Sequence, residues 1–251
     1  MDDIARVAAV IPARYGSTRF PGKPLALIAG VSMIQRVYEA TAACREIDEV
    51  LVATDDQRII DAVEAFGGKA VMTSSDHETG TDRIAEAVQD VAADLIVNVQ
   101  GDEPLLPTFV LDDLVAAMRN SDAPMGTLAV PFSLAEKDAD DPNAVKAVVG
   151  ADGYALYFSR ACLPFVRTGG TPVEPLLHWG IYAYRRDFLY QYIAWERTPL
   201  EMCEMLEQLR ALENGARILV VKTTAQSAGV DVPEDVERVE RLLALQEGVN
   251  T

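Results

Sequence analysis

The sequence of 251 residues predicts a three-layer α/β fold built on a mixed, mostly parallel sheet. Short apolar runs alternate with amphipathic segments through the first hundred residues, which is the order of strand–helix–strand units. The runs are almost continuously apolar, as expected for strands that helices cover on both faces. A hydrophobic fraction of 49% and a charged fraction of 24% are ordinary for a folded domain of this length.

The first half supplies the parallel strands and their helices. Strands are expected at 6–11, where Pro12 ends the run, and at 50–53, 69–72 and 95–99. Helical spacing is seen from Met33 to Cys44 and again from Ile59 to Phe66, where Gly67 and Gly68 end the helix. A third helix is expected near 81–91.

The second half is more mixed. Strands are expected at 127–131, 145–149, 154–159, 178–184 and 217–222. A capping box at 198–201, with proline in the first helical position, predicts one helix that ends at Asn214-Gly215. A last helix begins near 231–234. We therefore expect a single domain over 1–251, with an insertion around 120–180 that covers the site or forms a dimer contact.

Charge and cysteine content exclude several classes of partner. Lys and Arg total 22 against 39 Asp and Glu, a net charge of −17, which repels nucleic acids and anionic lipid. No apolar stretch approaches a membrane span, and the acidic start does not resemble a signal peptide. Three widely spaced cysteines fit neither a disulfide framework nor a zinc site. We expect a cytoplasmic protein with no nucleic-acid or membrane partner.

A basic loop follows the first strand. Residues 12–24 carry Arg14, Arg19 and Lys23, with two glycines that allow backbone N–H groups to approach an anion. Ligands of open α/β sheets bind beyond the carboxyl ends of strands, so this loop is the best candidate phosphate site. It is not a P-loop, because five residues separate its glycines and a proline follows Lys23. The alternative is an ordinary surface loop.

Carboxylates supply a candidate metal site. Asp102 follows the strand 95–99 in the segment VNVQGDEP, and one or two carboxylates with phosphate oxygens are typical ligands of Mg²⁺. Asp231 precedes a helix, where it is either a second ligand or an N-cap. Arg160, just past a strand, is either a ligand for an acidic substrate or a solvated side chain. In the segment TGTDR, Thr81 or Asp82 suffices to cap a helix.

Six segments resemble one family, the 3-deoxy-manno-octulosonate (KDO) cytidylyltransferases. They are IPARYGSTRFPGKPL, TGTDR, VNVQGDEP, HWGIY, EMLEQLR and GVDVPED, in order along the chain. The departures are small: Phe20 stands where leucine is frequent, Trp179 where a smaller apolar residue is usual, and Val232 where threonine is usual. The resemblance implies the nucleotide-diphospho-sugar transferase fold.

The same resemblance implies a role for each site residue. Nucleotide ligands would be Arg14, Ser17, Arg19, Lys23 and Arg83. Asp102 and Asp231 would hold Mg²⁺ and, with Lys23, form the catalytic set. Sugar ligands would be Gln100, Arg160, His178, Tyr182, Glu207 and Gln208.

The implied reaction transfers CMP from CTP to the anomeric 2-hydroxyl of KDO, an acidic eight-carbon sugar. Its products are CMP-KDO, used in lipopolysaccharide biosynthesis, and pyrophosphate. The resemblance also implies a homodimer. Two alternatives stay open: the same chemistry on 8-amino-KDO or sialic acid, and a CTP-binding regulator without catalysis. Pyrophosphate release with each sugar acid distinguishes them.

Overall fold

The structure, a computed structural model, describes residues 4–16, 19–132, 141–225 and 228–249. The chain divides into two compact units. We call Ile4–Asp112 with Ser227–Thr251 the N-terminal unit, and Asp113–Gln226 the central unit. The region 120–180, predicted as an insertion, belongs wholly to the central unit. Within the described ranges, no helix combines the length and apolar character needed to cross a membrane.

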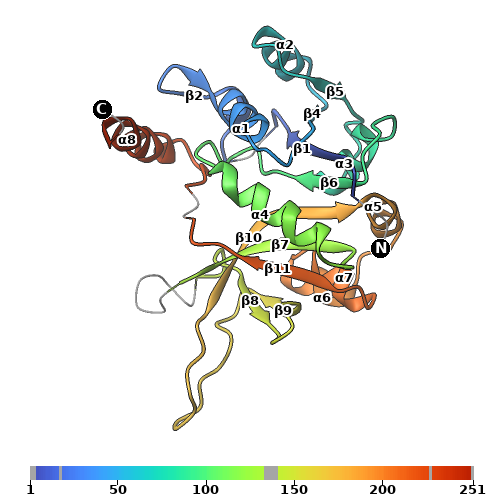
Figure 1. Cartoon of the computed structure of the whole chain (residues 1–251). Helices are drawn as coiled ribbons and strands as arrows, with labels where there is room; N and C mark the ends of the chain where they lie inside the picture. Colours follow the sequence, from blue (N-terminus) through green and yellow to red (C-terminus); the bar gives the residue numbers. More distant parts are fainter. Residues whose placement is uncertain (1–3, 17–18, 133–140, 226–227, 250–251) are drawn as a thin grey trace. The chain divides into compact units, whose positions relative to one another are not determined.

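Four parallel strands form the sheet of the N-terminal unit, in the order β6, β1, β4, β5 (Figure 1). They are β1 (Val7–Ala13), β4 (Glu49–Thr54), β5 (Ala70–Met72) and β6 (Leu95–Asn98). Val10 pairs with Leu51 on one side and Asn98 on the other. The predicted parallel arrangement is confirmed, although β1 runs through Pro12, which was expected to end it.

Three helices pack against these strands, and each begins where a polar side chain accepts a backbone N–H. They are α1 (Met33–Ala42), α2 (Gln57–Ala65) and α3 (Gly80–Ala87). Ser32 caps α1, and Asp56 caps α2. Thr79 forms a capping box with Asp82 at α3, so the cap lies two residues before Thr81, and Asp82 completes it from the third position.

The remaining elements of the N-terminal unit lie around the basic loop. They are the 3₁₀ turn η1 (Lys23–Leu25), the short hairpin of β2 (Leu27–Ile28) and β3 (Val31–Ser32), and the terminal helix α8 (Glu234–Val249). Ile28, Met33, Val230 and Val239 form one apolar cluster. Glu240 of α8 accepts a 2.7 Å hydrogen bond from the backbone N–H of Ala29. The C-terminal helix is thereby fixed beside β2.

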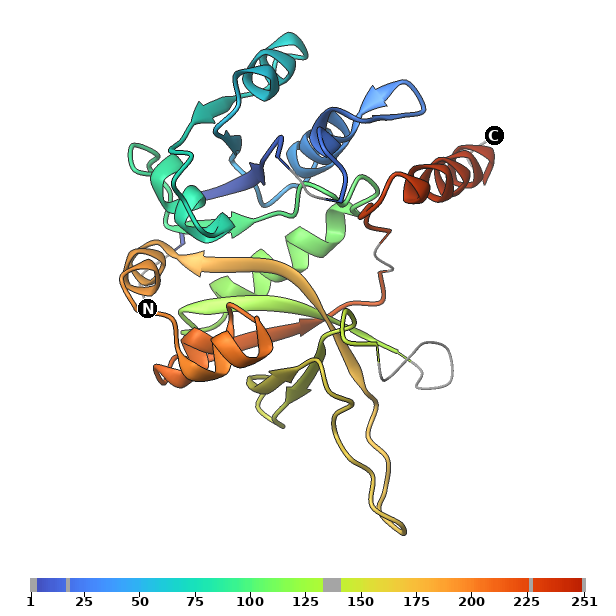
Figure 2. The same cartoon turned by 180° about the vertical axis from the view of Figure 1, so that it is seen from behind.

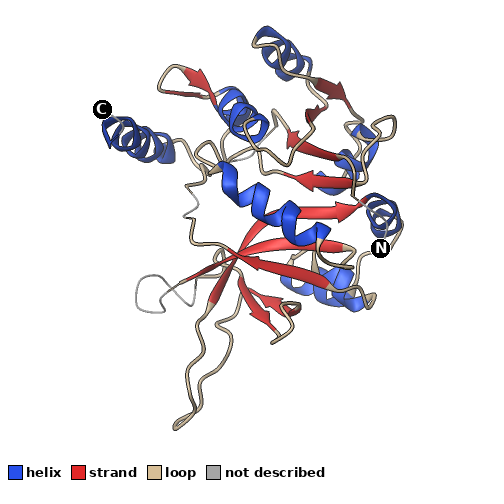
Figure 3. Cartoon of the chain, viewed as in Figure 1, coloured by secondary structure: helices blue, strands red, loops and turns tan. Residues whose placement is uncertain are grey.

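The central unit contains the mixed part of the sheet (Figure 3). Its strands are β7 (Met125–Pro131), β8 (Lys146–Val149), β9 (Ala155–Ser159), β10 (Leu176–Arg185) and β11 (Ile218–Lys222). β7 pairs antiparallel with β10 and parallel with β11, while β8 pairs antiparallel with both β9 and β10. The register of β10 against β7 shifts between Trp179 and Tyr182.

The central helices differ from the sequence prediction. The structure contains α5 (Arg186–Ile193), α6 (Pro199–Glu204) and α7 (Leu209–Glu213), with α4 (Thr108–Arg119) at the boundary of the two units. The single helix predicted from 198 to 214 is wrong, because the chain turns at Met205, whose φ of 52° is left-handed. The Arg160 guanidinium donates to the carbonyls of Glu204 and Met205, which in a continuous helix would accept backbone N–H groups four residues further on.

Residues 160–175, between β9 and β10, form an extended arm without helix or strand (Figure 2). The arm reverses near Gly169, whose φ is 82°, and Gly170 donates a 2.7 Å bond to the carbonyl of Arg167. Apolar side chains on the arm face solvent, with Phe165 86% and Val173 61% exposed. The described residues of this unit leave these side chains uncovered.

Candidate active site

A pocket of about 360 Å³ lies in the N-terminal unit where β1 and β6 end. These strands are parallel neighbours, so their carboxyl ends meet at one edge, where open α/β sheets bind ligands. The lining residues are Pro12, Ala13, Arg14, Gly16, Lys23, Pro24, Glu78, Gly80, Gln100, Gly101 and Asp102. Arg14, Lys23, Gln100 and Asp102, all predicted site residues, therefore share one pocket.

Glycine shapes the basic loop at Gly22. Its φ of 72° is left-handed, and its N–H donates a 2.9 Å bond to the carbonyl of Tyr15, which closes the loop. A Cβ here would also stand 3.2 Å from the Tyr15 ring. Arg58 covers this ring, with its guanidinium carbon 3.3 Å from the centroid. The loop therefore packs on the Tyr15 ring, a residue of the segment IPARYGSTRFPGKPL to which the sequence had assigned no role.

A second glycine, Gly101, forms the base of the pocket. A Cβ at this position would lie 3.2 Å from the carbonyl oxygen of Pro12 and 3.4 Å from the Ile11 side chain. The backbone after β6 can therefore approach the end of β1 only because no side chain stands between them. This approach places Gln100 and Asp102 beside the basic loop.

Lys23 links both predicted metal ligands. Its Nζ donates to the Asp102 carboxylate at 2.7 Å and to the carbonyl of Val230 at 2.8 Å, and it lies 4.0 Å from the Asp231 carboxylate. The lysine side chain is only 16% exposed, so this ion pair is partly shielded from water. Two carboxylates thus converge on one cation at the pocket.

The carboxylate of Asp231 does not cap α8. The backbone N–H groups of Asp231 and Val232 instead donate to Asp235, at 2.9 and 3.1 Å. Asp231 pairs with Arg19 at 3.4 Å and faces Lys23. The structure brings the Asp231 carboxylate beside Arg19 and Lys23, and its role as a metal ligand stays a prediction.

Two of the other predicted nucleotide ligands, Arg14 at the pocket and Arg19, have exposed side chains. Arg14 is exposed, and its guanidinium donates to the carbonyl of His77. Arg19 is exposed beside Asp231. Ser17 lies outside the described residues.

Arg83 is buried and bonded to other side chains of the N-terminal unit. Its side chain is fully buried, pairs with Asp55 at 2.8 Å and donates to the Thr73 hydroxyl at 2.5 Å. These bonds join α3 to the segments that follow β4 and β5, and Arg83 is absent from the pocket lining. Its predicted role as a nucleotide ligand stays a prediction.

Two predicted sugar ligands lie together on β10 of the central unit. The His178 and Tyr182 rings are 5.4 Å apart, and Phe158 contacts the other side of the imidazole. The Nε2 of His178 is hydrogen-bonded to the Thr127 hydroxyl at 2.9 Å. Burial lowers the pKa of His178 to about 3, so the imidazole is neutral at physiological pH.

This burial predicts a pH-dependent stability. Between the unfolded pKa of about 6.5 and the folded value of about 3, the unfolded chain binds a proton that the folded chain excludes. The free energy of unfolding should therefore fall as pH drops below 6.5, by up to about 1.4 kcal/mol per pH unit from this group. A His178→Asn variant should lose that part of the slope in urea titrations between pH 7 and 5. Tyr182→Phe should keep it, and equal slopes in all three proteins would contradict the assignment.

Arg160 is anchored by backbone carbonyls. Its Nε, Nη1 and Nη2 donate to Glu204, Pro142 and Met205 at 2.7, 2.6 and 3.2 Å. The fully buried Lys146 donates to the carbonyl of Arg160 at 2.7 Å and to two further carbonyls. The guanidinium is therefore held in one orientation.

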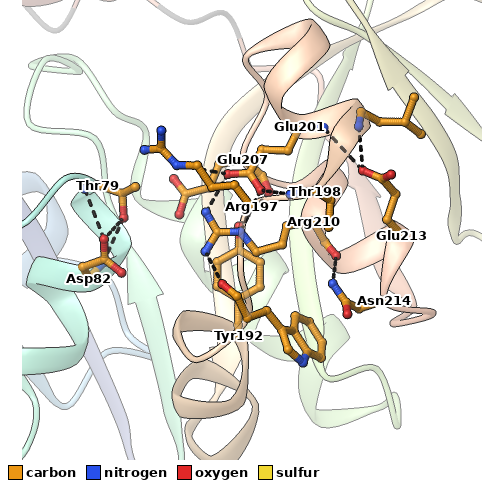
Figure 4. Close-up of polar contacts among 12 residues, drawn as sticks. Thr79, Asp82, Tyr192, Arg197, Thr198, Glu201, Glu207, Arg210, Glu213 and Asn214 are labelled. Carbon is orange, nitrogen blue, oxygen red and sulfur yellow. Dashed lines mark hydrogen bonds and ion pairs between the residues drawn. The ribbon is translucent and has the colours of Figure 1, made fainter.

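Glu207 and Gln208 lie in the turn between α6 and α7. Figure 4 shows Glu207 near Arg210 and Tyr192. The carbonyl of Glu207 accepts a 2.7 Å bond from the Tyr192 hydroxyl. Arg210, just beyond, makes two bonds to the buried Glu201, at 2.7 and 2.5 Å, and lies over the Tyr192 ring. Gln208 is 3% exposed, and its Nε2 has no hydrogen-bond partner within the described part of the chain.

The sequence did not identify several residues near these sites. Glu78, just before the segment TGTDR, lines the pocket. Lys146 belongs to no motif, and the contacts of Lys146 and Glu204 with Arg160 join residues 14 and 44 positions apart. Glu204 stands at the start of the segment EMLEQLR, which was the one available signal.

Comparison with known proteins decides the family. A family model described as cytidylyltransferase matches residues 8–218. A relative from Geobacter sulfurreducens, named 3-deoxy-manno-octulosonate cytidylyltransferase, is 52% identical over 244 residues, 93% of this chain and 97% of the relative. The chain belongs to this cytidylyltransferase family. The cytidylyltransferase of the same name from Myxococcus xanthus is 51% identical, with 97% of this chain and 98% of the relative covered.

A solved structure agrees with this membership. The solved structure of a CMP:2-keto-3-deoxy-manno-octonic acid synthetase, complexed with CTP, matches this chain with a TM-score of 0.92 and 45% identity. The match covers 96% of this chain and all of that one. A cytidylyltransferase from Leptospira borgpetersenii, 18% identical with a TM-score of 0.65, shares the fold. The predicted fold class and the assignment as a nucleotidyltransferase are confirmed.

Proposed function

We propose that the chain transfers CMP from CTP to the anomeric 2-hydroxyl of KDO, with release of pyrophosphate. The observation that carries this proposal is the sequence identity with KDO cytidylyltransferases, 52% and 51% for the two relatives above, along nearly the whole chain. The pocket supports it, because Arg14 and Lys23 offer cations for phosphate beside Asp102 in a chain of net charge −17. CMP-KDO made in this way would enter lipopolysaccharide biosynthesis.

In this reaction the oxygen of the sugar 2-hydroxyl forms a bond to the α-phosphorus and gives up its proton to solvent, as the bond from that phosphorus to the pyrophosphate oxygen breaks. Negative charge grows on the departing pyrophosphate, and Arg14 and Lys23 stabilise it. Arg160 would bind the carboxylate of the sugar acid, and the neutral His178 and Tyr182 would bind its hydroxyl groups. These residues orient the 2-hydroxyl for attack.

The donor set fits Mg²⁺. Asp102 and Asp231 already converge on the Lys23 ammonium, at 2.7 and 4.0 Å. One or two carboxylates together with substrate phosphate oxygens are the usual ligands of Mg²⁺. When bound there, Mg²⁺ neutralises phosphate charge and lowers the pKa of the sugar hydroxyl.

The decisive experiment measures pyrophosphate release from CTP, with and without KDO and Mg²⁺. Release that requires both supports the proposed reaction and cofactor. Release with 8-amino-KDO or sialic acid, but not with KDO, keeps the chemistry and changes the substrate. CTP binding without release for any of the three acids supports the non-catalytic regulator instead.

We also propose a cytoplasmic homodimer. The three cysteines are free thiols, which agrees with a reducing compartment. Exposed Phe165 and Val173 on the arm, with Leu156 at 64% exposure, offer an apolar surface for a second copy. Sedimentation should give twice the chain mass of 27.3 kDa, and Phe165→Glu should shift it toward the monomer. A monomeric wild type would overturn the dimer.

A further inference from the structure

The carboxylate of Glu204, the last residue of α6, collects hydrogen bonds from the end of β9. It accepts from the Ser159 hydroxyl at 2.6 Å and from the backbone N–H of Arg160 at 2.8 Å. A third, longer contact of 3.5 Å comes from the Tyr157 hydroxyl. Because Ser159 is only 2% exposed, the strongest of these bonds is shielded from water.

The side chain of Arg160 in turn donates hydrogen bonds to the backbone of Glu204 and Met205. Its Nε donates to the carbonyl of Glu204 at 2.7 Å, and its Nη2 donates to the carbonyl of Met205 at 3.2 Å. The side chain of each residue thus binds the backbone of the other. Three of the five guanidinium N–H groups donate to backbone carbonyls within the described residues, which leaves two to bind a ligand.

The same contact fixes the turn that follows. Met205 adopts a left-handed conformation unusual for a residue with a side chain, so the surrounding bonds must hold it there. Three residues later, Gln208 is almost fully buried with its Nε2 unpartnered in the described structure. This buried amide is therefore available to hydrogen-bond a ligand.

We propose that Glu204 is a positioning residue for the acidic sugar, which fixes Arg160 and the Gln208 turn in their binding geometry. The inference rests on the proposed function, because it assigns the sugar acid to Arg160 and Gln208. Glu204 itself acts through these neighbours and does not bind the sugar.

The charge of Glu204 is part of this role. Burial alone would raise the pKa of its carboxyl, but hydrogen bonds from Ser159, Arg160 and Tyr157, with the Arg160 charge, lower it. The group is therefore a carboxylate at working pH and accepts at both oxygens. Glutamine keeps the shape but places an N–H₂ group where one of these acceptors stands.

The test is steady-state kinetics of Glu204→Gln with CTP and KDO varied separately. We expect KM for KDO to rise at least tenfold and KM for CTP to stay within twofold, because the nucleotide residues lie in the N-terminal unit. Ser159→Ala, which removes one bond, should raise KM for KDO less. If Glu204→Gln fails to fold, this second variant still tests the inference.

The matched control is Asp122→Asn. Asp122 belongs to the same unit and accepts from Arg217 at 2.7 Å and from Tyr154 at 3.3 Å, away from the turn. Its variant should keep the wild-type KM for KDO, even if its Tm falls as far as that of Glu204→Gln. An equal rise in both variants would mean that Glu204 serves stability alone.

Two failures are distinguishable. Wild-type enzyme that releases no pyrophosphate with KDO would overturn the proposed function, and this inference with it. An active wild type whose KM for KDO is unchanged in a folded Glu204→Gln variant, or in Ser159→Ala, would overturn the inference alone.

Discussion

Asp102→Asn should reduce kcat by about a thousandfold or more while CTP still binds within tenfold of the wild-type affinity. The substitution removes one of the two carboxylates that converge at Lys23, and with it the charge needed to hold a divalent cation. Arg14 and Lys23, the cations expected to bind the phosphates, are unchanged in this variant. Lys23 loses the negative charge of the carboxylate 2.7 Å away, which leaves its own charge available to the phosphates. Calorimetric CTP titration and pyrophosphate release measure the two effects separately.

Asp94→Asn is the control for this substitution. Asp94 is an exposed carboxylate of the same unit that accepts the backbone N–H groups of Ala5 and Arg6, at 3.0 and 2.9 Å, outside the pocket. Its variant should retain wild-type turnover. Normal turnover in Asp102→Asn would show that the metal and catalytic assignments of this residue are wrong.

Asp55→Ala should destabilise the protein by roughly 3 kcal/mol, because it leaves the Arg83 guanidinium buried without its charged partner. The Arg83 side chain is 0% exposed, so water cannot replace the lost carboxylate without rearrangement. The Asp55 side chain is 22% exposed, which places the expected loss at the lower end of the range for buried pairs. Urea unfolding followed by circular dichroism measures it.

The double variant Asp55→Ala with Arg83→Met should regain much of this loss, because it removes the uncompensated charge. CTP affinity of Arg83→Met is measured alongside. Unchanged affinity together with this recovery would establish a structural role for Arg83. Lost affinity with little effect on stability would support the nucleotide role that the resemblance implied.

The sequence predicted the elements whose signals are local. Val7–Ala13 and Leu95–Asn98 are fully or nearly fully buried apolar runs, and the polar residues that follow them mark the pocket edge. The helix start at 54–56 is capped by Asp56, but α3 is capped by Thr79, two residues before the Thr81 that the sequence offered with Asp82. Local patterns were therefore sufficient to place Arg14, Lys23 and Asp102 at one sheet edge, whereas Gln100 was named only through the family resemblance.

Tertiary contacts decided what the sequence could not. No glycine or proline marks the turn at Met205, which forms because Arg160, more than forty residues earlier, takes the helical carbonyls. The segment TGTDR is equally compatible with Arg83 exposed or buried, and Asp55 decides between them from 28 residues away. Propensity and spacing contain no information about such partners.

The approach of the backbone at Gly101 has a consequence for how such enzymes diversify. Gly101, Gly80, Gly16, Pro12, Pro24 and Ala13 line the nucleotide pocket with main chain or very short side chains. Substitution at these six positions would mostly add side-chain volume to the wall of this pocket. The central unit instead presents Arg160, His178, Tyr182 and Gln208, each of which one codon change can replace. New sugar specificities should accordingly evolve through the central unit, while the means of binding the nucleotide is inherited intact.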